Sequence, residues 1–155
     1  MKSGARILFV CLGNICRSPL AHGAMREAAR RHDLDVEIDS AGTGDWHVGK
    51  APDDRAVAVA RANGVDISDL RARQVSADDF HIYSHIFALD EQNLADLRAI
   101  APQDAKAQTC LLLDMVDGRE GQAVADPYYG NDSGFETTWR QVSEAADAIV
   151  AQLRS

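Results

Sequence analysis

A short apolar run that leads through a glycine turn into a helix is the feature that most restricts how this chain can fold. Arg6 to Val10 is rich in apolar and β-branched residues, which is typical of a strand buried on both faces of a parallel sheet. Gly13 follows in a turn. Ser18-Pro19 then predicts a helix, with serine at its N-cap and proline at its first position, that extends to about His32. The chain therefore begins with a buried strand that leads directly into a helix.

The remaining sequence repeats this alternation of strands and helices. Three further strands are expected over residues 36–40, 83–89 and 109–113. Further helices are expected from Asp53 to Asn63, through Leu94, Leu97 and Ile100, and from Phe135 to Leu153. Polar or glycine-rich loops are expected over residues 42–49 and 114–134. This order predicts an α/β fold with a doubly wound, mostly parallel sheet, which binds ligands at the carboxyl ends of its strands.

The length and net charge of the chain indicate how many domains it has and which partners it can bind. A chain of 155 residues can bury one good core, so a single domain over residues 1–155 is expected. The net charge of -8 provides no basic surface for a nucleic acid or an anionic membrane. Asn14 and Arg17 interrupt the only stretch that resembles a signal peptide, so a cytoplasmic location is expected.

Three cysteines in a chain without an export signal argue against a disulfide framework. Cys110 falls in an apolar strand and is interpreted as an inert core residue. The five histidines show no metal-ligand spacing with the cysteines, so no metal site is expected. Trp139 lies in the last predicted helix and is interpreted as a packing residue. At least one cysteine is left for chemistry.

The loop after the first strand carries a cysteine and an arginine separated by five residues, Cys11-Leu12-Gly13-Asn14-Ile15-Cys16-Arg17-Ser18. Backbone N–H groups of a tight loop, together with the positive end of the next helix, form a concave site for a phosphate. The same field favours the thiolate of Cys11 as a nucleophile. Arg17 can hold two phosphate oxygens with its planar guanidinium. The loop is therefore predicted to bind and attack a phosphate ester.

An aryl phosphate also needs a proton donor for its departing oxygen. Asp126 is the leading candidate, because it lies in a long loop and is stiffened by Pro127. Tyr128, Tyr129 and Trp46 could enclose a slot for a flat aromatic ring. A phosphatase acting on aromatic phosphate esters is therefore predicted.

Several segments together resemble the low-molecular-weight protein tyrosine phosphatase family, and the resemblance covers nearly the whole chain. The similar segments are residues 10–19, 39–42, 45–49, 72–74, 89–91 and 126–130. The resemblance implies a flavodoxin-like fold with a four-stranded parallel sheet flanked by helices, and a two-step reaction without metal or other cofactor. It further implies phosphotyrosine proteins or peptides as substrates and inorganic phosphate as product. A monomer or weak homo-oligomer is expected.

The resemblance also assigns roles to single residues. Cys11 is the nucleophile, Arg17 and the loop amides hold the phosphate, and Asp126 acts first as acid and then as base. Ser18 donates a hydrogen bond to the Cys11 sulfur. Asn14 and Ser40 match positions whose hydrogen bonds maintain the loop shape.

At two positions the sequence departs from the family pattern. Leu70 stands where a histidine usually completes the hydrogen-bond network, so a modest loss of stability or rate is expected. His22 replaces a frequent glutamate and is interpreted as a surface change. Cys16 matches a second loop cysteine of the family. Two interpretations of Cys16 remain: it forms a reversible disulfide with Cys11 under oxidation, or it is a packed thiol without a redox role.

Three alternative functions remain for comparison. Arsenate reductases of related fold need a further pair of cysteines, for which this chain offers only Cys110. Protein arginine phosphatases tend to carry threonine where this loop has Ile15, and they lack the tyrosine pair. A phosphate-binding or phospho-carrier protein would have no need for the acid Asp126. These contrasts favour phosphotyrosine as the substrate.

Overall fold

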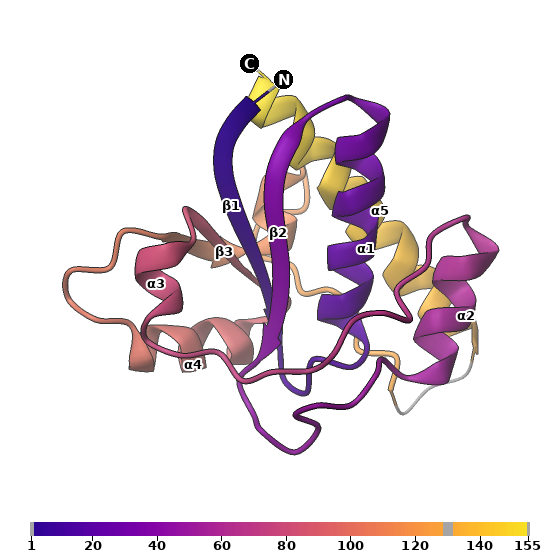
Figure 1. The fold of residues 1–155 in the computed structure, drawn as a ribbon, viewed down its shortest axis with the longest axis horizontal. Helices are drawn as coiled ribbons and strands as arrows, with labels where there is room; N and C mark the ends of the chain where they lie inside the picture. The colour runs from indigo at the N-terminus through magenta and orange to yellow at the C-terminus, as the bar shows by residue number, and fades with distance from the viewer. Residues whose placement is uncertain (1, 129–131, 155) are drawn as a thin grey trace.

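A four-stranded sheet forms the centre of the computed structural model, which describes residues 2–128 and 132–154 (Figure 1). Its strands are β1 (Lys2–Cys11), β2 (Asp35–Gly42), β3 (His85–Ala88) and β4 (Gln108–Leu111), in the order β2-β1-β3-β4. All three pairings are parallel, and Phe9 of β1 lies between Ser40 and Phe87. The predicted parallel α/β sheet is confirmed.

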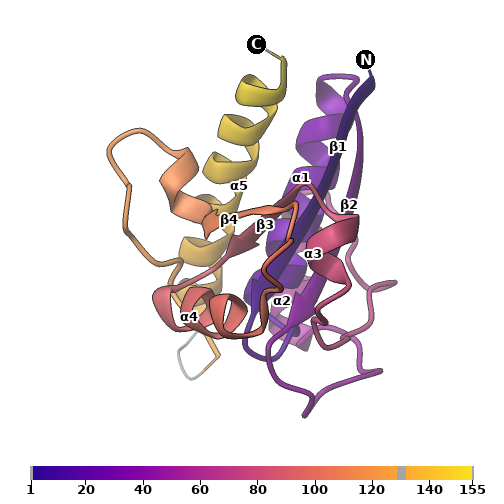
Figure 2. The same ribbon diagram turned by 90° about the vertical axis from the view of Figure 1, so that its left-hand side faces the viewer.

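Helices cover both faces of this sheet (Figure 2). The helices are α1 (Arg17–Arg31), α2 (Asp54–Ala62), α3 (Asp79–Ile82), α4 (Glu91–Ile100) and α5 (Asp132–Arg154). Ile7 and Phe9 of β1 belong to the core that includes residues of α1, α2 and α5, whereas Leu8 and Val10 belong to the core with residues of α3 and α4. Successive side chains of a strand point to opposite faces, so an apolar run is needed where both faces are covered.

The first helix begins differently from the prediction. Its N-cap is Cys16, which makes no side-chain capping bond, and Ser18 and Pro19 are the second and third helical residues. The Ser18 hydroxyl does not cap the helix because it is hydrogen-bonded within the loop that precedes it. Pro19 is tolerated there because N–H groups in the first turn have no partner within the helix.

Other boundaries also shift. β4 ends at Leu111, two residues early, because Leu112–Met115 forms a 3₁₀ turn. α5 begins at Asp132, inside the predicted loop, and the short helix α3 was not predicted. The start of α2 is confirmed, since the Asp53 side chain accepts a hydrogen bond from the Arg55 N–H at 2.9 Å. None of the helices in the described ranges is long and apolar enough to span a membrane.

The ends of β1 and β2 run into loops that are fastened together. The N–H groups of Thr43 and Gly44 donate to the carbonyls of Cys11 and Leu12, both at 2.9 Å. A Cβ atom on Gly42 would lie 2.7 Å from the Leu12 carbonyl oxygen, so only glycine fits this crossing. The sheet thus brings the loop after β1 and the loop after β2 to one edge.

Candidate active site

The loop between β1 and α1 lines a cavity of about 100 Å³ at the carboxyl edge of the sheet. The first amides of α1 begin here, and such amides have no partner within their own helix. Ten residues line the cavity: Cys11, Leu12, Gly13, Ile15, Cys16, Arg17, Trp46, His47, Asp126 and Tyr128. Nine of these ten were predicted as site residues from the sequence, and His47 is the additional one.

Cys11 is only 4% exposed, and its Sγ lies 3.0 Å from Oγ of Ser18. The same hydroxyl accepts a bond from Nδ2 of Asn14 at 2.8 Å and lies 3.3 Å from the Ala41 carbonyl oxygen. Ser18 has one proton and two possible acceptors. When Cys11 is a thiolate it cannot donate, so the Ser18 proton must point to sulfur for this contact to be a hydrogen bond. The arrangement can therefore stabilise a thiolate at Cys11.

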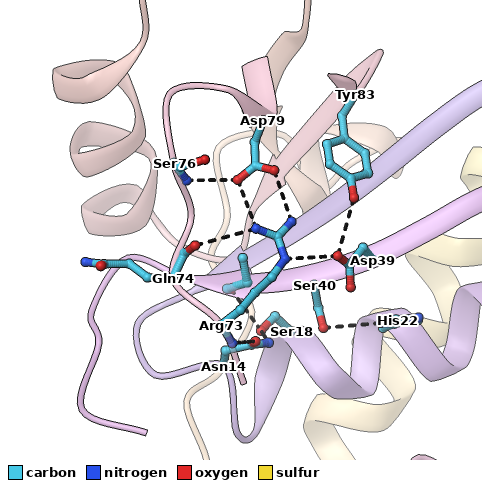
Figure 3. Close-up of polar contacts among 11 residues, drawn as sticks. Asn14, Ser18, His22, Asp39, Ser40, Arg73, Gln74, Ser76, Asp79 and Tyr83 are labelled. Atoms are coloured by element: carbon cyan, nitrogen blue, oxygen red, sulfur yellow. Dashed lines mark hydrogen bonds and ion pairs between the residues drawn. The ribbon is translucent and has the colours of Figure 1, made fainter. Parts of the chain in front are cut away.

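Asn14 holds the loop in an uncommon backbone shape. Its φ of 58° lies in the left-handed region, which asparagine tolerates better than most residues. Its Oδ1 accepts a hydrogen bond from the Arg73 N–H at 3.0 Å while its Nδ2 donates to Ser18 (Figure 3). Both ends of the Asn14 amide are thus used, and the side chain is almost fully buried. Asn14 therefore joins the loop after β1 to the segment that contains Arg73.

Arg73 fixes the segment that meets Asn14. Its guanidinium lies between Asp39 of β2 and Asp79 of α3, with contacts of 3.0 and 3.1 Å (Figure 3). Burial opposes the charged form of Arg73, but these two carboxylates outweigh it and raise the pKa of Arg73. No role was predicted for this arginine, because its pairing with Asp39, 34 positions away, depends on how the chain folds.

Ser40 does not contact Asn14 through any hydrogen bond among the described residues. Its hydroxyl is instead hydrogen-bonded to Nδ1 of His22 at 3.2 Å (Figure 3). The interpretation of His22 as a surface change is therefore wrong, since this side chain is 4% exposed. Burial, and then Arg26, lower the pKa of His22 to about 4, so its ring is neutral at physiological pH. Leu70, the other departure from the family pattern, is buried in the larger apolar core.

Arg17 is nearly buried and is oriented by groups that sequence reasoning missed. Its Nη1 donates to Oδ2 of Asp90 at 2.8 Å and to the Val124 carbonyl at 3.2 Å. Asp90 is also the N-cap of α4, where its Oδ1 accepts from the Asn93 N–H at 2.7 Å. An aspartate just before a helix signals a cap, but nothing in the sequence indicates that its second oxygen binds Arg17.

Asp126 and Tyr128 form a more exposed wall of the cavity. The Asp126 side chain is 45% exposed, and its Oδ2 lies 3.6 Å from Nη2 of Arg17. Its Oδ1 accepts a bond from the Tyr128 N–H at 3.1 Å. Arg55 of α2 donates to the Tyr128 carbonyl at 2.9 Å and lies 5.7 Å from the centre of the tyrosine ring. Tyr129, the other predicted ring contact, lies outside the described residues.

Trp46 and His47 come from the loop after β2. Trp46 was predicted as a cavity residue and is 66% exposed, whereas His47 was missed. A Cβ on Gly13 would lie 2.9 Å from Cδ2 of His47, so the glycine lets the two loops approach. The sequence signal for His47 was its place beside Trp46 in a glycine-rich loop at the sheet edge.

The thiols of the other two cysteines, Cys16 and Cys110, lose protons less readily than an ordinary thiol, because the pKa of each is raised. Cys16 lines the cavity but is buried, and burial together with Asp53 raises the pKa of its thiol. Cys110 is partly buried in β4, and burial raises the pKa of its thiol as well. Trp139 is a core residue, as predicted. Within the described part of the chain, no group of three or more His, Cys, Asp or Glu side chains is placed to hold a metal ion.

Comparison with known proteins agrees with this geometry. The family model described as low molecular weight phosphotyrosine protein phosphatase matches residues 6–155. A protein of that description from Schizosaccharomyces pombe is 39% identical over 145 residues, which is 92% of each chain. A protein tyrosine phosphatase structure from Entamoeba histolytica superposes with a TM-score of 0.91 at 34% identity, covering 97% of both chains.

A Drosophila structure described as an arginine phosphatase is also similar, with a TM-score of 0.90 at 30% identity over 96% of this chain and 98% of the other. Each of these similarities covers more than nine-tenths of this chain. The chain belongs to the low molecular weight phosphotyrosine protein phosphatase family.

Proposed function

We propose that this protein hydrolyses phosphotyrosine in proteins or peptides through a cysteinyl-phosphate intermediate. The observation that carries the proposal is a nearly buried Cys11, hydrogen-bonded to Ser18, in a cavity that also contains Arg17 and Asp126. A phosphate bound there would face the amino end of α1 and the Arg17 guanidinium, both of which favour an anion.

The reaction has two steps. In the first, Sγ of Cys11 attacks phosphorus, and the bond from phosphorus to the tyrosine oxygen breaks as Asp126 protonates that oxygen. In the second, Asp126 takes a proton from water while the water oxygen attacks phosphorus. The sulfur–phosphorus bond breaks, inorganic phosphate is released, and the Ser18 hydroxyl donates a hydrogen bond to the departing thiolate of Cys11. The exposed position of Asp126 gives it access to both the leaving group and water.

Phosphotyrosine is the favoured substrate because two aromatic side chains line the cavity. Trp46 and Tyr128 line the cavity, and Arg55 holds Tyr128 in place. The finer predictions about this enzyme, a cytoplasmic location and a monomeric or weakly associating state, remain predictions.

The test is hydrolysis of p-nitrophenyl phosphate, a phosphotyrosine peptide and phosphoarginine in the presence of a chelator, by the wild type, Cys11→Ser and Asp126→Asn. We expect activity that Cys11→Ser abolishes and that prefers the phosphotyrosine peptide. Preference for phosphoarginine would instead indicate that this protein is an arginine phosphatase, as the Drosophila relative is described. Tight phosphate binding without turnover would indicate a phospho-carrier, and such a protein should be indifferent to Asp126→Asn.

A further inference from the structure

A second hollow lies directly beside the candidate active site. This hollow, which we call the flanking groove, has a volume of about 310 Å³ and lies between the loop after β2 and α4. Its lining includes Leu12, Thr43, Trp46, Asp96, Ala99 and Ile100. None of the mechanistic steps described above uses the side chains that α4 contributes to it.

The flanking groove and the active-site cavity share a wall. Leu12 and Trp46 line both hollows, and both side chains are largely exposed, at 45% and 66%. A residue one or two positions from a phosphotyrosine lies about 3.5 to 7 Å farther along an extended peptide. A peptide with its phosphotyrosine in the cavity can therefore cross this wall and place a neighbouring side chain in the groove.

Exposed apolar side chains are concentrated at this place. Six large apolar side chains are exposed among the described residues, and three of them, Leu12, Trp46 and Ile100, line the flanking groove. A fourth, Tyr128, lines the active-site cavity. Single exposed apolar residues are common on soluble proteins, but a cluster in a groove marks a binding surface.

We propose that the flanking groove binds an apolar residue within two positions of the phosphotyrosine of a substrate peptide. This inference rests on the proposed phosphotyrosine phosphatase function and adds a sequence preference to it. Asp96 places a carboxylate in the groove, which favours a lysine or arginine near the apolar residue and disfavours an acidic one. The preferred substrate is thus an apolar and basic phosphotyrosine segment.

The first experiment compares peptides that differ only beside the phosphotyrosine. One has alanine at the two positions on each side, and the others carry leucine at one of those positions. We expect wild-type kcat/KM for the best leucine peptide to exceed that for the alanine peptide about five- to tenfold, as expected for partial burial of one aliphatic side chain. Turnover of p-nitrophenyl phosphate provides the reference, because this substrate has no flanking residues.

Two matched variants test whether the preference for leucine peptides arises in the flanking groove. Ile100→Asn makes the α4 side of the groove polar, and Ile82→Asn makes the same change at an equally exposed isoleucine, on α3, that lines neither hollow. Ile100→Asn should reduce the leucine preference to twofold or less and leave p-nitrophenyl phosphate turnover unchanged. Ile82→Asn should change neither quantity.

A third variant tests the charge of the groove. With wild-type protein, a peptide with lysine beside the leucine should be hydrolysed faster than one with glutamate, and added salt should reduce the difference. Asp96→Asn should reduce this charge preference severalfold while the leucine preference remains.

Several results would overturn the proposal. Equal kcat/KM for the alanine and leucine peptides, with normal p-nitrophenyl phosphate turnover, would exclude the groove as a substrate site and leave the proposed function intact. Sedimentation that changes from dimer to monomer with Ile100→Asn, without effect on peptide preference, would show that a second copy covers the groove. Absence of phosphotyrosine hydrolysis by the wild type would overturn both proposals together.

Discussion

The two sides of the candidate active site are held in place very differently. On one side, Cys11 and Arg17 are both 4% exposed, and their side-chain partners are Ser18 and Asp90. Ser18 is bonded in turn to Asn14, and Asp90 to the Asn93 N–H. On the other side, Asp126 is 45% exposed. Its segment is tied by bonds such as those from the Ala125 N–H to Gln141 and from Arg55 to the Tyr128 carbonyl.

This difference fits the two roles proposed above for Arg17 and Asp126. Groups that bind a phosphate work best when they are fixed before the substrate arrives, because no reorganisation is then needed during the reaction. A group that serves first a leaving oxygen and then water must stay accessible to both. Substitutions on the buried side should therefore lower the turnover of every substrate by the same factor. Substitutions on the exposed side should lower turnover by a factor that depends on the leaving group of the substrate.

The largest effect is expected for Arg17→Lys. Lysine cannot donate to Asp90 and grip the phosphate with the same planar fork, so kcat/KM should fall about 10³-fold. The loss should be the same for p-nitrophenyl phosphate and phenyl phosphate. Arg26→Lys is the control, since Arg26 lies on the same helix and pairs with Asp69 at the surface. If the loss of kcat/KM in Arg17→Lys instead varies with the leaving group, the two sides of the site do not differ in the way proposed.

Asp126→Asn should give the next largest effect. Asparagine cannot supply a proton, so kcat for phenyl phosphate should fall about 10²-fold, while p-nitrophenyl phosphate, with its better leaving group, should lose less than tenfold. Asp117→Asn, at an exposed aspartate of the same segment, should change neither rate. Equal losses for the two esters would assign Asp126 to phosphate binding rather than to proton transfer.

Asn14→Ala tests the rigidity of the buried side. The change removes two buried hydrogen bonds and places alanine at a left-handed φ, which should cost about 2–4 kcal/mol of stability and lower kcat roughly tenfold. Asn14→Gly keeps the backbone shape but loses the bonds, so it should be more stable than Asn14→Ala. Thermal unfolding together with turnover separates strain from hydrogen bonding. If glycine and alanine behave alike, backbone strain is not part of the effect.

His22 should make the stability of the protein depend on pH. Its pKa is about 4 in the fold against 6.5 ordinarily, so the unfolded chain binds a proton between these values and the fold does not. Stability should therefore fall as the pH drops from 6.5 towards 4, by up to about 3 kcal/mol. Burial and Arg26 lower this pKa, whereas Asp39 and Asp69 oppose them.

Unfolding midpoints of the wild type and His22→Asn across this pH range provide the measurement. Asparagine can still bond to Ser40 but does not titrate, so the variant should lose less stability in acid. Parallel curves for the two proteins would show that His22 does not carry the pH dependence.

The same contrast explains how far the sequence could predict this molecule. The strand at Arg6–Val10, the cavity-lining loop after β1 and the cavity residue Asp126 could be predicted because local patterns mark them: an apolar run, a Cys and Arg at fixed spacing, an Asp-Pro pair. The pairings of Arg17 with Asp90, Asn14 with Arg73 and His22 with Ser40 join residues 18 to 73 positions apart. Such pairs depend on how strands and helices pack, which no local pattern records.

The smallest effect on turnover is expected for Leu70→His, the change towards the family pattern. The sequence suggested that an apolar residue at this position weakens the hydrogen-bond network, but His22 already supplies an imidazole to Ser40. A histidine at position 70 would enter the apolar core and cost about 1–3 kcal/mol of stability, while kcat should change less than twofold. Thermal unfolding and p-nitrophenyl phosphate turnover measure both quantities.

The double variant His22→Leu with Leu70→His then sharpens the interpretation. If its turnover exceeds that of His22→Leu alone, an imidazole at either position 22 or position 70 can form the hydrogen bond to Ser40. Leu70 then costs the protein no activity, because His22 forms that bond. If Leu70→His alone raises both stability and turnover, the Ser40–His22 bond is no substitute. The buried side of the site would then be incompletely supported in this protein.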